Sequence, residues 1–102
     1  MPLIQFNLPH ALEPDDVAAR LKKYLARLRE RNEPKFLVKT EVWNGNHLTC
    51  SFSSYSFAMN AEIRVEPKEL GFEVNIPFAA IMFKGQIEQR LRDELTKLLS
   101  TE

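Results

Sequence analysis

The chain has 102 residues, which is the length of one domain, and we expect residues 1–102 to form a single α+β domain. Apolar residues make up 44% of the chain and charged residues 27%, which is typical of a soluble globular protein. Basic and acidic residues balance at 14 each, and this argues against a nucleic-acid-binding protein, because such proteins need a basic face to displace counterions.

A strand and a helix are the first predicted elements. Residues 3–8 (LIQFNL) alternate apolar and polar side chains, which predicts a half-buried strand. Pro14 suits the first position of a helix, and Asp15 and Asp16 suit its positive end. Apolar residues then recur at three- and four-residue steps, so the sequence predicts a helix over Pro14–Arg31.

Four alternating segments follow, and they predict strands at residues 36–43, 47–52, 57–65 and 72–76. Asn44-Gly45-Asn46 between the first two is a hairpin signal. Alternation sustained over so many segments is typical of an antiparallel sheet with one apolar face and one polar face.

The same alternation predicts the two faces of the strand at 36–43. Its apolar face is expected to carry Phe36, Val38 and Val42. Its polar face is expected to carry Leu37, Lys39, Glu41 and Trp43. An exposed tryptophan beside a leucine can mark a contact site, and packing of the ring under the hairpin turn or against a strand end is an equally open alternative.

An amphipathic helix closes the chain. Its apolar stripe consists of Ile87, Leu91, Leu95 and Leu98. The preceding run PFAAIMF (77–83) is apolar, but its helical face does not continue in phase onto that stripe. Gly85 lies at the break and costs about 1 kcal/mol relative to alanine in a helix interior. The sequence therefore predicts a kink near Lys84–Gly85, or a helical turn at 78–83 followed by the main helix.

These elements predict an α+β two-layer sandwich in the order β-α-β-β-β-β-α. The sheet is expected to be mostly antiparallel, with both helices on its one apolar face. The position of the first strand in the sheet stays open, as does the burial of residues 77–83.

The chain carries no sign of export. The apolar start at Met1–Leu8 is too short for a signal peptide, and no run of about 18 apolar residues predicts a transmembrane segment. Cys50 is the single cysteine, so it cannot form an internal disulfide. A reducing, cytoplasmic location is therefore expected.

The C-terminal FKGQIEQRLRDELTKLL resembles the end of the polyhydroxyalkanoic acid system family of small bacterial proteins. The matching positions are Lys84, Gly85, Ile87, Glu88, Leu91, Leu95 and Leu98. His10 before a helix and Trp43-Asn44-Gly45-Asn46 before Leu48 also resemble the family, whereas 53–61 (SSYSFAMNA) lacks the glycines that the family tends to carry there. The resemblance implies a link to storage-polyester granules, whose synthesis genes tend to neighbour those of the family. It implies no catalytic residue.

Two kinds of surface are candidates for partner contact. The first is the basic face of the predicted helix, within a region from Arg20 to Lys39 that holds eight basic and two acidic residues. Its members on the helix are Arg20, Lys22, Lys23, Arg27, Arg29 and Arg31. An amphipathic basic helix is more often a solvated face than a binding site for an anionic surface. The second surface is apolar and consists of Leu37, Trp43, Phe78 and Phe83.

Catalytic and metal-binding residues are not predicted. His47 and Cys50 stand three apart in a strand, so they should face opposite sides of the sheet and not share a metal. Asp15–Asp16 and Asp93–Glu94 diverge as neighbours on helices, whereas acid–base catalysis needs converging carboxylates. We therefore expect a protein that is no enzyme and has no cofactor.

Two functions remain open. The first is an accessory protein of the polyester system that contacts the granule surface or a granule-associated protein. The alternative is a small carrier with a helix-grip-like fold that encloses an apolar ligand, an idea that depends on fold analogy alone. Neither function excludes a homodimer.

Overall fold

The computed structural model describes residues 2–31, 37–54 and 57–100. Its elements, in chain order, are β1 (Leu3–Pro9), α1 (Pro14–Arg31), β2 (Leu37–Asn44), β3 (His47–Ser54), β4 (Phe57–Val65), β5 (Glu69–Asn75), the 3₁₀ helix η1 (Phe78–Phe83) and α2 (Lys84–Leu99). The predicted α+β order is confirmed, and so is the helical turn at 78–83 that precedes the main helix.

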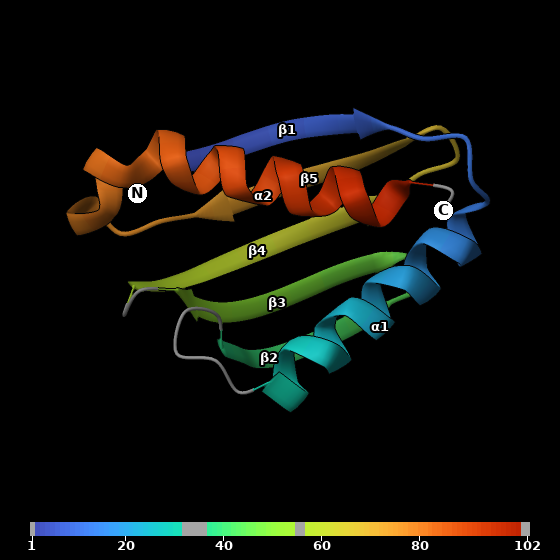
Figure 1. The fold of residues 1–102 in the computed structure, drawn as a ribbon, viewed down its shortest axis with the longest axis horizontal. Coiled ribbons are helices and arrows are strands. Elements are labelled where there is room, and N and C mark those ends of the chain that lie inside the picture. The colour runs from blue at the N-terminus through green and yellow to red at the C-terminus, as the bar shows by residue number, and fades with distance from the viewer. Residues whose placement is uncertain (1, 32–36, 55–56, 101–102) are drawn as a thin grey trace.

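The five strands form one antiparallel sheet in the order β1-β5-β4-β3-β2. The first strand therefore lies beside the last strand and not beside the second. Both helices lie on one face of this sheet, α2 over the side of β1 and β5 and α1 over the side of β3 and β2 (Figure 1). The predicted two-layer sandwich is confirmed, and the other face of the sheet is left without a helix (Figure 1).

The core fills the space between the sheet and the two helices. The strands contribute mainly alternate residues, as expected for a sheet with one buried face, and the helices contribute their apolar stripes. The residues with the least exposure and the largest volume are Ile4, Leu21, Leu48, Met59, Leu70 and Ile76. At the edge of this layer the Arg92 guanidinium of α2 lies 4.6 Å from the ring centroid of Phe6, which itself stacks on Phe72.

The predicted faces of β2 are wrong beyond Val38. Val38 pairs with Phe52 and Thr40 with Ser51, so Lys39 is an extra residue and the register shifts at a β-bulge. A one-residue shift exchanges the two faces of a strand. Val42 is consequently 61% exposed on the outer face, whereas Trp43 lies on the helix side opposite the buried Leu48.

Leu37 precedes the bulge and lies on the outer face opposite Ser53, as predicted. The prediction for Phe36 lies outside the described residues.

β5 begins three residues earlier than predicted. Leu70 is fully buried and pairs with Val65, so the alternation of β5 extends back through Gly71. A Cβ atom at Gly71 would stand 2.7 Å from Nη2 of Arg64. Glycine here therefore marks a close approach within a strand, where the Arg64 side chain crosses toward Glu73, and not a turn.

Candidate apolar contact surface

The segment that joins β5 to α2 carries an exposed apolar surface. Its exposed large side chains are Phe78, Ile81, Met82 and Phe83, which we call the η1 patch. Phe78 is 70% exposed and Met82 is 88% exposed. Figure 1 shows η1 at one end of the long axis of the molecule, where the chain turns from β5 into α2.

The geometry of a 3₁₀ helix accounts for this exposure. Side chains three residues apart lie above one another in such a helix, so the segment has three rows. Ala80 and Phe83 form the inward row, in which Ala80 is fully buried and the Phe83 ring lies 6.2 Å from that of Phe57. The other two rows point away from the core and are exposed. They consist of Phe78 with Ile81 and of Ala79 with Met82.

The chain enters and leaves this turn abruptly. Pro77 is extended, with φ −70° and ψ 156°, and its carbonyl accepts a hydrogen bond from the Ala80 N–H at 2.9 Å. α2 begins at once at Lys84. A 3₁₀ helix of six residues between these two elements turns only one of its three rows inward, so residues 77–83 are mostly exposed.

The η1 patch differs from the other exposed apolar positions. Among the described residues, the only other exposed large hydrophobic side chains are Leu3 and Val42, which stand on the two edge strands of the sheet. Single exposed apolar residues are normal, whereas a contiguous group marks a contact surface. Sequence analysis identified Phe78 and Phe83 but missed Ile81 and Met82, which a three-residue period would have revealed.

Trp43 does not join this surface. It lies opposite Leu48, which pairs with Ile63 near the end of β4, whereas Phe83 contacts Phe57 at the start of that strand. The Trp43 Nε1–H donates a hydrogen bond of 2.7 Å to Oε2 of Glu41.

The ring of Trp43 is also tied to α1. Lys22 places its ammonium 4.9 Å from the ring centroid, and Oε1 of Glu41 lies 3.4 Å from a guanidinium nitrogen of Arg29. The prediction that Trp43 lies on the solvent-facing side of the sheet is therefore wrong. The alternative prediction, a packed ring, describes its position.

The basic residues of α1 fall into two groups. Arg20 donates hydrogen bonds to the carbonyls of Leu98 and Ser100, and so ties α1 to the end of α2. Lys23 and Arg27 are exposed and have no ion-pair partner in the described part of the chain. Arg31 at the end of α1 is likewise exposed and without an ion-pair partner in this part of the chain, so these three residues are available to an external anion.

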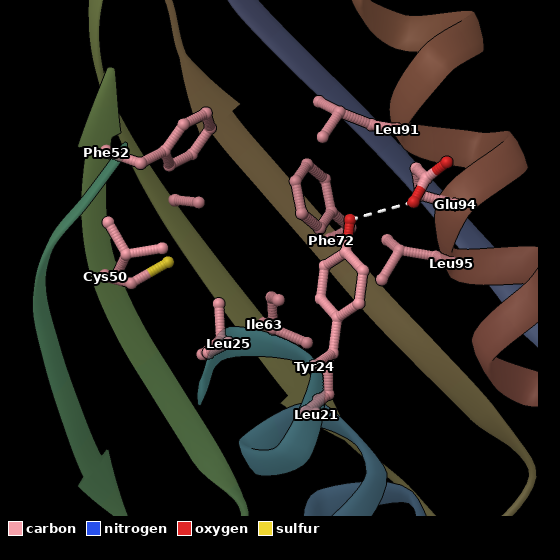
Figure 2. Close-up of a pocket in the computed structure, with 12 residues that line it drawn as sticks. Leu21, Tyr24, Leu25, Cys50, Phe52, Ile63, Phe72, Leu91, Glu94 and Leu95 are labelled. Atoms are coloured by element: carbon pink, nitrogen blue, oxygen red, sulfur yellow. Dashed lines mark hydrogen bonds between the residues drawn. The ribbon is translucent and has the colours of Figure 1, made fainter. Parts of the chain in front are cut away.

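A small apolar cavity of about 40 Å³ lies between the helices and the sheet (Figure 2). It is lined by Leu21, Tyr24, Leu25, Val38, Cys50, Phe52, Ala61, Ile63, Phe72, Leu91, Glu94 and Leu95. The Tyr24 hydroxyl donates a hydrogen bond of 3.0 Å to Oε1 of Glu94 at the side of this cavity. Burial, followed by the adjacent Glu94 carboxylate, raises the pKa of Tyr24.

The histidines hold structural positions. The His10 ring accepts a hydrogen bond from the Leu12 N–H at Nδ1 and lies 2.8 Å from the Glu66 carbonyl at Nε2, so it joins the β1–α1 connection to the turn after β4. His47 lies on the outer face beside Glu62, opposite to the buried Cys50, as predicted. Across the described ranges, no three histidine, cysteine or acidic residues gather as metal ligands.

Neither helix of the described chain is both long and apolar enough to span a membrane. None of the curated proteins compared with the chain matches it. A family model does match, over residues 4–99, and this range takes in the sheet, both helices and the η1 patch. The chain therefore belongs to the family described as "Putative polyhydroxyalkanoic acid system protein (PHA_gran_rgn)".

Proposed function

We propose that this protein is a non-enzymatic accessory protein of the storage-polyester system that attaches to the granule surface through the η1 patch. The family description supplies the biological setting. The observation that carries the proposal is the exposure of four large apolar side chains within the six residues of η1. Such a granule offers an apolar ester polymer as a partner, and this matches the chemistry of the patch.

The shape of η1 suits a surface better than a groove. Its two outward rows project at one end of the molecule, and the turn is anchored behind them by the buried Ala80. A short apolar segment that is already exposed can enter an apolar layer without rearrangement of the core. The binding energy then comes from apolar area removed from water, at about 25 cal/mol per Å².

The alternative function, a carrier that encloses an apolar ligand, is not supported by the size of the internal cavity. A dry cavity of about 150 Å³ is needed to hold a ligand the size of benzene. The apolar cavity of this protein measures about 40 Å³. In the described conformation the interior therefore has no space for an apolar ligand, and this favours a role for the exterior surface.

Co-sedimentation with purified polyester granules tests the proposal. We expect wild-type protein in the pellet, and a variant with Ile81→Asp and Met82→Asp in the supernatant. Both side chains are exposed, so the fold should tolerate the changes. Val42→Asp is the matched control, because Val42 is exposed and apolar on the opposite face. Equal pelleting of the wild type and the double variant would reject the granule-contact role of η1.

The proposed site of action is the cytoplasm, where the granules lie. A homodimer remains part of the proposal, since the η1 patch of one copy is an apolar partner for another. Sedimentation equilibrium of the free protein measures this directly. Dimers that persist in the Ile81→Asp and Met82→Asp variant would place the dimer interface elsewhere.

A further inference from the structure

A groove of about 260 Å³ runs between α1 and α2. Its lining consists of Tyr24, Arg27, Leu28 and Arg31 from α1, and Glu94, Lys97 and Leu98 from α2. None of these residues belongs to the η1 patch, so the groove is a separate feature of the molecule.

Positive charge dominates the groove. Among the described residues that line it, Arg27, Arg31 and Lys97 accompany one carboxylate, that of Glu94. Glu94 already accepts the Tyr24 hydrogen bond, and its Oε2 lies 3.9 Å from Nζ of Lys97. The two guanidinium groups have no ion-pair partner in the described ranges, which leaves their charge available to a ligand.

The spacing of the two arginines is unfavourable without a ligand. Arg27 and Arg31 stand four residues apart on α1, so their side chains share one side of the helix. Like charges at this spacing repel and destabilise a helix. The negative end of the helix dipole compensates Arg31 in the last turn but reaches Arg27, one turn earlier, only weakly. An anion between the two guanidinium groups removes the repulsion.

Two leucines form the apolar part of the lining. Leu28 and Leu98 contribute from the two helices beside the cations. Tyr24 and Glu94 line both this groove and the apolar cavity. Figure 2 shows their hydrogen bond at the side of the cavity. A ligand that fits the groove must therefore combine an anionic group with a short apolar chain.

We propose that the groove between α1 and α2 binds an anionic amphiphile, namely a carboxylate or phosphate headgroup on a short alkyl chain. The headgroup lies among Arg27, Arg31 and Lys97, and the alkyl chain packs on Leu28 and Leu98. Arginine suits this task because its planar fork donates two parallel hydrogen bonds to carboxylate or phosphate oxygens. The groove volume restricts the ligand to a short chain.

Titration of the full chain with four probes, followed by amide chemical shifts, tests the chemistry of the site. The probes are octanoate and octyl phosphate below their micelle-forming concentrations, 1-octanol below its solubility limit, and acetate. We expect octanoate or octyl phosphate to shift the amides of Arg27 to Arg31 and of Glu94 to Leu98, and the tighter of the two identifies the headgroup. Binding of 1-octanol or acetate as tightly as the better amphiphile would overturn the proposal, as would the absence of binding by both amphiphiles.

Charge-neutral variants test the placement. Arg27→Gln with Arg31→Gln should weaken binding by about tenfold, the effect of losing one or two charge-assisted hydrogen bonds. Lys23→Gln with Lys68→Gln is the control, because it removes the same charge from exposed positions outside the groove. Equal weakening by the two pairs would show general charge attraction and reject the site. The Ile81→Asp and Met82→Asp variant should bind the probe like the wild type, which separates this proposal from granule contact.

Discussion

The Cys50 thiol faces the apolar cavity from β3 and is 5% exposed. Its neighbours around the cavity are mainly apolar, so the thiolate loses its hydration without gaining a close cation. Burial, followed by the Glu41 carboxylate, raises the pKa of Cys50 to about 11, and only Arg29 acts in the opposite direction. A thiol of this kind is a small core residue and a poor nucleophile at neutral pH.

The stability of the protein should therefore fall at alkaline pH. The folded pKa of Cys50 is above its ordinary value of 9.0, so the stabilisation is fully present below pH 9.0 and is lost as pH rises toward about 11. One pKa unit corresponds to about 1.4 kcal/mol, so the loss is at most about 2–3 kcal/mol. Urea unfolding at a series of pH values measures it.

A Cys50→Ala variant provides the comparison for this pH dependence. It should be less stable than the wild type at neutral pH, because it leaves a gap in the core, but should lose less stability between pH 9 and pH 11. The raised pKa of Tyr24 acts in the same direction and remains in the variant. Parallel pH curves for the two proteins would contradict the burial of the thiol.

Among the elements, α1 shows what sequence patterns can predict. Proline at its first position, two aspartates in its first turn and a long apolar stripe all indicate the same helix, and its bounds are confirmed. β2 shows where such patterns fail. Lys39 and Thr40 are both exposed and polar, so either could be the extra residue of a bulge, and alternation alone cannot reveal the exchange of faces.

The bounds of β5 fail for another reason. The predicted strand began only after Gly71, because the sequence did not show that this glycine lies within a strand beside the Arg64 side chain. Cross-strand neighbours decide such positions, and their register is a property of the whole sheet.

Gly85 offers a test at the level of α2. It is the second residue of the helix, it lacks the positive φ seen at Gly45, and a Cβ atom added to it would meet no atom within 4 Å. Gly85→Ala should therefore stabilise the protein by about 0.5–1 kcal/mol, because alanine loses less backbone entropy in a helix. For a domain of this size we expect the Tm to rise by about 2–8 °C in thermal unfolding.

Gly45→Ala is the opposite control. Gly45 has a φ of 63° in the β2–β3 hairpin, where alanine is strained, so this change should lower the Tm. If Gly85→Ala also lowers the Tm, then the change from the 3₁₀ helix η1 to α2 requires the glycine.

For the whole molecule, the sequence placed the candidate surfaces less well than the elements. Phe78 and Phe83 were identified from one apolar run, but only the three-row geometry of η1 shows that Met82 is the most exposed of the large apolar side chains. The groove at Arg27 could not be predicted, because strands β2 to β5 separate its two walls, α1 and α2, in the sequence. Contacts between elements that are distant in the sequence create such sites. The pattern of a single sequence describes each helix separately and does not show which helices will lie side by side.

The distribution of charge predicts how granule attachment responds to salt. The net charge is zero, and six of the basic residues stand on α1, whereas η1 itself carries no charged residue and is followed by Lys84. Raising the salt concentration from about 0.1 M to about 1 M shortens the screening length from about 10 Å to about 3 Å, and it does not weaken apolar contacts. If the η1 patch makes the contact, the fraction of protein that pellets with granules should stay constant or rise over this range.

Attachment through the basic helix predicts the reverse. Pelleting would then fall steeply with salt, and Lys23→Gln with Arg27→Gln would reduce it at low salt while Met82→Asp would not. Measured with both variants across the salt series, the sedimentation assay separates insertion of an apolar turn from attraction to an anionic coat. A steep salt dependence that survives the Ile81→Asp and Met82→Asp changes would assign granule contact to α1 and leave η1 without that role.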